Sequence, residues 1–199
     1  EGFNNAEEAY EFFKEIMDST GSWCGDKVLN RATRLDQTHA GTIENFKTVP
    51  SAPLQELYNE ARELEIFGLP LPKEHGGLET PVILYLILVV QLSRGCLASS
   101  TQIAFFTSIG DMVNRFLSKE DRARLVPLIC RGEISGSMNM TEPGAGSDIG
   151  LITTMAKPVE GTSNYKITGS KIFITNGGGG LAFVLARTPD APKGMKGLS

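Results

Sequence analysis

The sequence predicts a mixed α+β protein, with an N-terminal all-helical domain followed by an antiparallel β-domain. Up to about Gly132, apolar residues recur at the spacing of helix faces. From Ile134 onward, glycine and threonine become frequent, and short β-prone runs alternate with turns. We therefore expect a helical domain at residues 1–133 and a β-domain at residues 134–199.

Two amphipathic helices are expected early in the helical region. One covers Glu7 to Met17. The other follows Ser51, because Pro53 suits the first turn of a helix, and it should end at Gly68. The apolar face of this second helix is expected to be Leu54, Leu57, Tyr58, Ala61 and Leu64.

The most apolar segment runs from Val82 to Val90. It is shorter than the roughly 20 residues that a membrane-spanning helix needs, so we expect no membrane span. A helix that is apolar all round is normally enclosed by its own protein. The sequence therefore predicts a helix from about Pro81 to Ser93 that is buried on all sides.

Two further helices should complete the helical region. After Gly95, residues 96–117 form a second mostly apolar stretch. Ser118 then resembles a helix N-cap, with the acidic Asp121 three residues later, and it predicts a last helix that ends at Cys130.

Short runs in the second half predict strands joined by turns. Residues 164–168 alternate polar and apolar side chains, as a half-buried strand does. Asn176, Gly177 and the glycines that follow predict a tight turn between two strands. The expected strands are Leu151–Val159, Tyr165–Thr168, Lys171–Thr175 and Leu181–Ala186.

Charge and cysteine usage argue against several classes of protein. The net charge is −4, and no basic run of the kind that binds nucleic acid occurs. The three cysteines are far apart and form no C-x-x-C pair, and the two histidines are isolated. We therefore expect no nucleic-acid partner, no disulfide framework and no metal site.

The segment of residues 137–148 is the best candidate for a ligand-binding loop. Its glycines and hydroxyls suit a backbone that approaches a ligand closely. It lacks the Gly-Lys-Ser/Thr ending of a Walker loop. Gly144, Gly146 and Gly150 miss the spacing of a Rossmann fingerprint, and β-prone residues follow them in place of a helix. On local chemistry alone, a plain glycine-rich turn remains the leading interpretation.

Two longer motifs resemble the central-domain signatures of the acyl-CoA dehydrogenase family. They are residues 140–148, Met-Thr-Glu-Pro-Gly-Ala-Gly-Ser-Asp, and residues 167–176, Ile-Thr-Gly-Ser-Lys-Ile-Phe-Ile-Thr-Asn. Val-Leu-Ala-Arg at 184–187 and the turn at 68–77 are also similar to that family, so the resemblance runs from about residue 50 to the end.

The resemblance implies a flavoprotein with a helical domain, a β-domain and a second helical domain, and with FAD held between the last two. The third domain would lie outside these residues, so the expected fold is a truncated form of this architecture. The catalytic base would lie in that third domain. We therefore expect no catalytic residue in this segment, and we expect the 199-residue chain alone to be inactive.

The same resemblance assigns roles in flavin binding. Thr141 would bond the pyrimidine edge of the isoalloxazine, Thr175 would bond flavin N5, and Ser147 would face the pyrophosphate and the thioester chain. Met138 stands where the family usually has an aromatic residue, and Phe173 stands in place of the commoner tryptophan. The implied cofactor-binding residues are Met138, Met140, Thr141, Gly146, Ser147, Phe173, Ile174 and Thr175.

The implied substrate residues are Ser147, Ser100, Thr101 and Ala104, the last three lying in a stretch that helps form the floor of the family's acyl pocket. Small side chains there favour a medium, branched or ring-bearing acyl group over a very short one. Close packing between helices explains the small residues equally well. Glu142 adjoins the flavin motif, but the resemblance makes it structural and not the base.

The implied reaction is FAD-dependent α,β-dehydrogenation of an acyl-CoA thioester, with electrons passed to an electron-transfer flavoprotein. Three alternatives remain at this stage: an acyl-CoA oxidase or related flavin oxidase, a flavin-bearing DNA-binding relative, and an interaction module without flavin. The family is usually a homotetramer or homodimer. We expect a cytoplasmic location in a bacterium, or the mitochondrial matrix in a eukaryote. The sequence specifies neither the acyl chain nor the electron acceptor.

Overall fold

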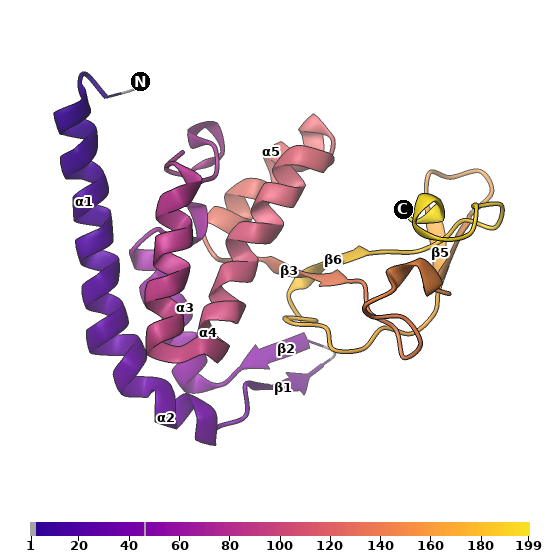
Figure 1. Ribbon diagram of the computed structural model, residues 1–199, viewed down its shortest axis with the longest axis horizontal. Helices are drawn as coiled ribbons and strands as arrows, with labels where there is room; N and C mark the ends of the chain where they lie inside the picture. The colour runs from indigo at the N-terminus through magenta and orange to yellow at the C-terminus, as the bar shows by residue number, and fades with distance from the viewer. Residues whose placement is uncertain (1–2, 46) are drawn as a thin grey trace. The chain divides into compact units, whose positions relative to one another are not determined.

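The computed structural model describes residues 3–45 and 47–199. Contacts divide the chain into two compact units, Glu1–Ser135 and Gly136–Ser199. Helices dominate the first unit, and short strands joined by long loops make up the second (Figure 1). The expectation of a mixed α+β fold with helices first is confirmed.

The first unit, the helical unit, has five α-helices within the described residues. They are α1 (Ala6–Trp23), α2 (Leu29–Gln37), α3 (Ala52–Glu63), α4 (Val82–Phe116) and α5 (Lys119–Cys130). A single π-helical turn, Cys24–Val28, joins α1 to α2. The helix predicted at Glu7–Met17 is therefore real but much longer. The predicted N-cap of α5 is confirmed, because the Ser118 side chain accepts a hydrogen bond from the amide of Asp121.

Helix α3 buries the face that its spacing predicts except at Leu64, which lies at the C-cap of the helix and is only half-buried. Its buried residues are Pro53, Leu54, Leu57, Tyr58 and Ala61. The helix ends at Glu63 and not at Gly68, because Glu65 adopts a left-handed φ of 54°. A 3-10 turn at Ile66–Gly68 follows, so residues 64–68 belong to a turn that helix periodicity alone did not distinguish from α3.

The expectation that the first domain is all-helical is wrong at one place. Strands β1 (Gly41–Glu44) and β2 (Lys47–Pro50) form an antiparallel hairpin between α2 and α3. A side chain at Gly41 would come within 2.3 Å of the Val49 carbonyl oxygen, so the close approach of these strands requires glycine there.

Helix α4 is interrupted in its middle. Cys96 has φ −157° and ψ 107°, which are not helical angles, so two helical segments meet there. This confirms the predicted pair of helices on either side of Gly95. The Tyr85 hydroxyl donates to the Ala104 carbonyl (2.9 Å) and therefore joins the two segments.

The core of the helical unit forms around Phe67, which is fully buried. Its ring stacks on Phe106 with centroids 4.2 Å apart, and its carbonyl accepts a hydrogen bond from the Thr107 hydroxyl (3.0 Å). Burial of such apolar area is the main stabilising contribution in a domain of this size. Other fully buried core residues are Leu57, Ile66, Leu69, Leu71, Leu88, Leu92, Ile103, Ile109 and Ile129.

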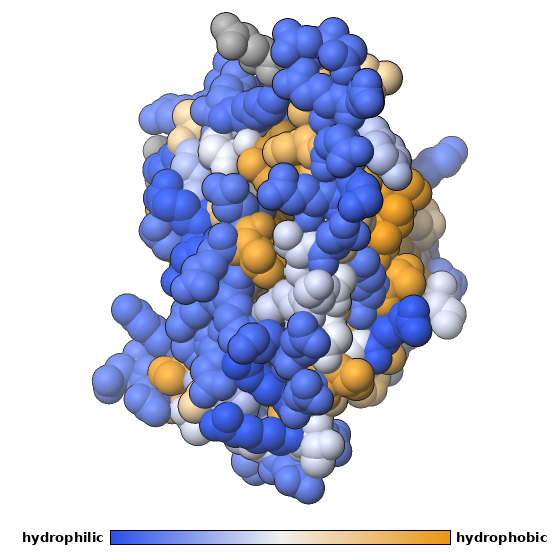
Figure 2. Space-filling model, turned by 90° about the vertical axis from the view of Figure 1, so that its left-hand side faces the viewer, coloured by the Kyte–Doolittle hydropathy of each residue, from blue (hydrophilic) through white to orange (hydrophobic). Residues whose placement is uncertain are grey.

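The expectation that the apolar helix is buried on all sides is wrong. Leu84, Leu88 and Leu92 face the core at helical spacing. The opposite side is exposed, with Val82, Ile83, Leu86, Ile87 and Val90 between 41% and 62% accessible. Because every face of this helix is apolar, the sequence could not predict that only one face is buried within this unit. Figure 2 shows apolar atoms at the surface on the side that it views, among mostly polar ones.

By length and composition alone, α4 could cross a membrane, and it is the one helix among the described residues that meets this test. Core helices of globular proteins meet the same test. The break at Cys96 interrupts the required length, so the finding carries no membrane assignment.

The second unit, the β-unit, contains two short sheets. Strand β3 (Ser135–Asn139) pairs with β6 (Gly180–Val184), and β4 (Met155–Pro158) pairs antiparallel with β5 (Tyr165–Thr168). Strand β5 is confirmed as predicted. It is not half-buried, however, because all four of its residues are exposed in this unit.

The strand expected at Leu181–Ala186 is β6, which ends at Val184, and two other expected strands differ more from the structure. Residues 151–159 form a strand only at Met155–Pro158, because a 3-10 turn at Ile149–Leu151 occupies the start of the predicted run. Residues 171–175 form no strand. Phe173 and Asn176 both adopt left-handed φ angles, 58° and 56°, which an extended strand cannot contain. The predicted turn at Asn176 is present, with the Gly179 amide bonded to the Asn176 carbonyl (3.0 Å), but only β6 adjoins it and no strand precedes it directly.

Candidate functional site

Glu142 lies at the centre of a buried hydrogen-bond network in the β-unit. Its carboxylate accepts bonds from the backbone amides of Thr153 (2.8 Å) and Thr154 (2.9 Å) and from both threonine hydroxyls. Lys171 Nζ adds an ion pair at 3.0 Å. Every described contact of this carboxylate therefore stabilises its ionised form.

The protonation of Glu142 follows from these contacts. Burial raises the pKa of the carboxyl, but hydrogen bonds from the side chains and amides of Thr154 and Thr153 lower it by more. The resulting pKa lies well below the ordinary value of 4.5. A general base must be able to accept a proton near the working pH, so the geometry supports the structural role that the resemblance implied for Glu142.

Lys171 joins the two signature segments. Its Nζ donates to the Met140 carbonyl (2.9 Å) as well as to Glu142. The next residue, Ile172, donates its amide to the Thr141 carbonyl (3.0 Å). Residues 140–142 and 171–172 therefore lie side by side, although they are far apart in the sequence.

In the loop that follows, Phe173–Thr175, the side chains of Phe173 and Thr175 are exposed and that of Ile174 is half-buried. Phe173 is 87% exposed, an unusual position for a phenylalanine. An aromatic residue also seldom adopts a left-handed φ, and such strain persists where the surrounding structure holds it in place. The Asn176 side chain donates to the Gly136 carbonyl (2.8 Å) and so attaches the far end of the loop to β3.

The remaining predicted cofactor residues are distributed along the same two segments. Thr175, Gly146 and Ser147 are exposed, Met140 is 37% accessible, and Met138, Thr141 and Ile174 are half-buried. The two segments thus offer aromatic and apolar groups together with three hydroxyls. Their contacts with a cofactor stay predictions.

The predicted substrate residues belong to both units. The Ser100 hydroxyl is buried against the hydroxyl of Ser93 (3.0 Å), whereas Thr101 is exposed and Ala104 is half-buried. These three lie in α4, and Ser147 lies in the β-unit. Their role in binding substrate stays a prediction.

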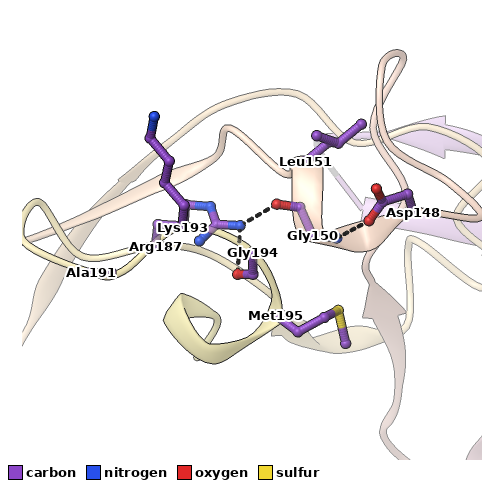
Figure 3. Close-up of a pocket in the computed structure, with 8 residues that line it drawn as sticks. All are labelled: Asp148, Gly150, Leu151, Arg187, Ala191, Lys193, Gly194 and Met195. Atoms are coloured by element: carbon purple, nitrogen blue, oxygen red, sulfur yellow. Dashed lines mark hydrogen bonds between the residues drawn. The ribbon is translucent and has the colours of Figure 1, made fainter.

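Arg187 is a residue whose importance the sequence did not reveal. Figure 3 shows its guanidinium directed at the carbonyls of Gly150 and Gly194. Arg187 lines a cavity of about 380 Å³ together with Ala191 and residues 193–195. It donates to the carbonyls of Ile152 (2.8 Å), Pro192 (3.0 Å), Gly194 (2.9 Å) and Gly150. These four bonds occupy most of the five N–H donors of arginine, so the group holds loops together and does not serve as an anion site. In the sequence, only its place in the Val-Leu-Ala-Arg motif could have pointed to Arg187.

We expect Arg187→Lys to destabilise the β-unit by about 1–3 kcal/mol, because an ammonium cannot reach four carbonyls in different directions. Urea denaturation of wild type and variant measures this. Arg124→Lys makes the same chemical change at an exposed position of α5, where only a surface ion pair with Asp121 is affected. It should alter stability by less than about 0.5 kcal/mol. Equal stability of both variants would contradict the conclusion that the Arg187 guanidinium holds these loops together.

Comparison with known proteins agrees with this geometry. A family model described as the acyl-CoA dehydrogenase N-terminal domain matches residues 12–133, and one described as the acyl-CoA dehydrogenase middle domain matches residues 137–199. The fold and motifs thus define the N-terminal and middle domains of that family. The chain belongs to the acyl-CoA dehydrogenase family.

Individual relatives agree with the family assignment. The chain is 34% identical over 169 residues to the short-chain specific acyl-CoA dehydrogenase of Clostridium acetobutylicum, covering 84% of this chain and 41% of that protein. It thus spans about two fifths of this relative.

Solved structures share the fold. One is the acyl-CoA dehydrogenase of Geobacillus kaustophilus, with TM-score 0.79, 21% identity and coverage of 95% of this chain and 47% of that one. Another is the acyl-CoA dehydrogenase of Bacillus anthracis complexed with FAD, with TM-score 0.75, 24% identity and coverage of 89% and 29%.

Proposed function

We propose that this protein catalyses FAD-dependent α,β-dehydrogenation of an acyl-CoA thioester. The observation that carries the proposal is the joining of the two signature segments by Lys171 and Glu142, with Phe173 and Thr175 presented beside them. The family membership and the names of the relatives support the same reaction.

The residues present suit a flavin. An isoalloxazine offers a flat aromatic face and a polar edge, which need an apolar surface and hydrogen-bond donors, respectively. Phe173 and Met140 supply exposed apolar surface, and Thr141, Ser147 and Thr175 supply hydroxyls. The donor set therefore fits FAD, and these residues would hold it.

FAD, when bound, supplies the acceptor for the β-hydride. The contribution of this chain is to bind and orient. Hydroxyls of Thr141 and Thr175 would donate hydrogen bonds toward developing negative charge, which favours reduction. Phe173 would exclude water from that surface. Glu142 stays ionised and bonded, so we assign the removal of the α-proton to no described residue of this chain.

The acyl group and the electron acceptor are further parts of the proposal. The small residues of α4 around Ala104 favour a medium, branched or ring-bearing acyl group, and an electron-transfer flavoprotein is the proposed acceptor. Rapid reoxidation of the reduced protein by air would instead favour an oxidase.

Substrate size can be tested at Ala104, which is half-buried. If it lines the acyl pocket, Ala104→Leu should lower activity on octanoyl-CoA several-fold more than on butyryl-CoA, because a packed interior has no room for added methylenes. Ala123→Leu, at an exposed position of α5 outside the expected pocket stretch, is the matched control and should leave both activities unchanged. A uniform loss across chain lengths would show that Ala104 only packs helices.

The contact of Thr175 with flavin can be tested by Thr175→Val, which keeps the side-chain shape and removes the hydroxyl. Loss of one hydrogen bond should cost about 0.5–1.5 kcal/mol of flavin interaction and shift the reduction potential or the reduction rate. Thermal stability should change little, because the residue is exposed without flavin. Thr168→Val, at an exposed position of β5, is the control. An unchanged spectrum and reduction rate would remove Thr175 from the site.

A visible absorption spectrum of the complete gene product tests the cofactor. We expect the two bands of oxidised flavin, and release of FAD on denaturation. A colourless protein that takes up no added FAD would refute the proposed function.

A further inference from the structure

We propose that Lys171 and Asn176 act as positioning residues that hold the Phe173–Thr175 loop in the conformation that flavin requires. The inference rests on the proposed function, because the flavin is what the loop would serve. It adds the residues that fix the loop and are not themselves expected to contact the cofactor.

Lys171 fixes the start of the loop. Its side chain is only 9% exposed, and Glu142, its partner, is 5% exposed. An ammonium in such surroundings is stable only while its partners stay in place. Both of its acceptors, the Met140 carbonyl and the Glu142 carboxylate, belong to the other signature segment. Any shift of residue 171 away from that segment would therefore leave two opposite charges unpaired.

Glu142 makes this anchor rigid. Four donors from Thr153 and Thr154 hold its carboxylate independently of Lys171. The carboxylate is thus a fixed point within the β-unit, and Lys171 transmits that fixed position to the loop.

Asn176 fixes the end of the loop. Its side chain donates to the Gly136 carbonyl (2.8 Å), which belongs to strand β3. Its φ of 56° is one that asparagine tolerates better than most residues. The chain between the two anchors contains the strained and exposed Phe173, and the anchors at both ends explain why this conformation persists.

Two variants test the anchors separately in the complete gene product. Lys171→Met keeps an unbranched chain of similar length and removes every donor. Asn176→Gly removes the amide donor while suiting the left-handed φ. Their controls are Lys166→Met at an exposed strand position and Asn45→Gly, an asparagine of the helical unit with φ 49°.

Two measurements apply to each variant. In the flavin-free protein, hydrogen–deuterium exchange of the peptide 171–179 should become about tenfold faster in both anchor variants and stay unchanged in both controls. In the flavin-loaded protein, the anchor variants should bind FAD about tenfold more weakly and show shifted visible bands.

The outcomes separate the two proposals. A wild type that takes up no flavin would refute the proposed function, while the exchange rates still decide whether the anchors hold the loop. Exchange and flavin binding equal to wild type in both variants would overturn the inference. A lowered thermal midpoint with unchanged exchange and unchanged flavin binding would also overturn the inference, because it would indicate that the two residues only stabilise the fold. If Lys171→Met does not fold, Asn176→Gly decides by the same measurements.

Discussion

Glu142→Ala should destabilise the β-unit by about 3–5 kcal/mol, the usual cost of removing one partner of a buried ion pair. The substitution leaves Lys171, whose side chain is 9% exposed, without its carboxylate partner. It also leaves the amides of Thr153 and Thr154 without their acceptor. Urea denaturation followed by circular dichroism measures the loss. Glu160→Ala, at an exposed position of the same unit, is the control and should change stability by less than about 0.5 kcal/mol.

The contribution of Glu142 should also depend on pH in a defined direction. Its pKa in the folded protein lies well below the ordinary 4.5, so the unfolded state binds the proton more readily. The stabilisation is therefore fully present above that ordinary value and is lost as the pH falls below it toward the folded pKa. The stability difference between wild type and Glu142→Ala should stay constant from neutral pH to about pH 5 and shrink below it. A difference that grows on acidification would contradict the assignment.

Phe67→Ala should destabilise the helical unit by about 3–5 kcal/mol, because the phenylalanine is fully buried and its removal leaves a cavity. The lost contacts include the stacked ring of Phe106 at 4.2 Å. Gly132 lies against the ring of Phe67, since a side chain at residue 132 would come within 2.5 Å of that ring.

Phe116→Ala provides the matched control for that experiment, because the same atoms are removed from a side chain that is 73% exposed. It should cost less than about 1 kcal/mol. Thermal unfolding of both variants decides the matter. Similar losses at the two positions would mean that Phe67 is not the centre of the core.

The helix faces could be predicted from the sequence, because burial and helix periodicity act on the same residues. The spacing of Leu54, Leu57, Tyr58 and Ala61 predicted the buried face of α3 correctly. Ser118 predicted the start of α5 because its hydroxyl is within reach of the Asp121 amide in any helix that starts there.

Features set by tertiary contacts could not be predicted in this way. Residues 171–175 are rich in β-prone side chains, yet Lys171 bonds to Met140 and Glu142 and the chain then turns at Phe173. The sequence could not predict which face of α4 is exposed, because the residues on both faces are apolar.

The candidate site was identified from the resemblance of two motifs to a known family, and not from residue spacing or local chemistry. Local chemistry left residues 137–148 as a plain glycine-rich turn, and only the resemblance singled out Thr141 and Thr175. The network around Glu142 and the loop contacts of Arg187 depend on residues distant in the sequence, so neither could be found without the structure.

Anaerobic addition of acyl-CoA to the complete gene product is the most direct test of the proposed reaction. We expect the visible flavin absorption to bleach on mixing with a saturated acyl-CoA, with formation of the enoyl-CoA in equal amount. The bleaching should occur without any other reductant. A flavin that binds but is reduced by no acyl-CoA, from butyryl to long-chain and branched forms, would contradict the proposed function.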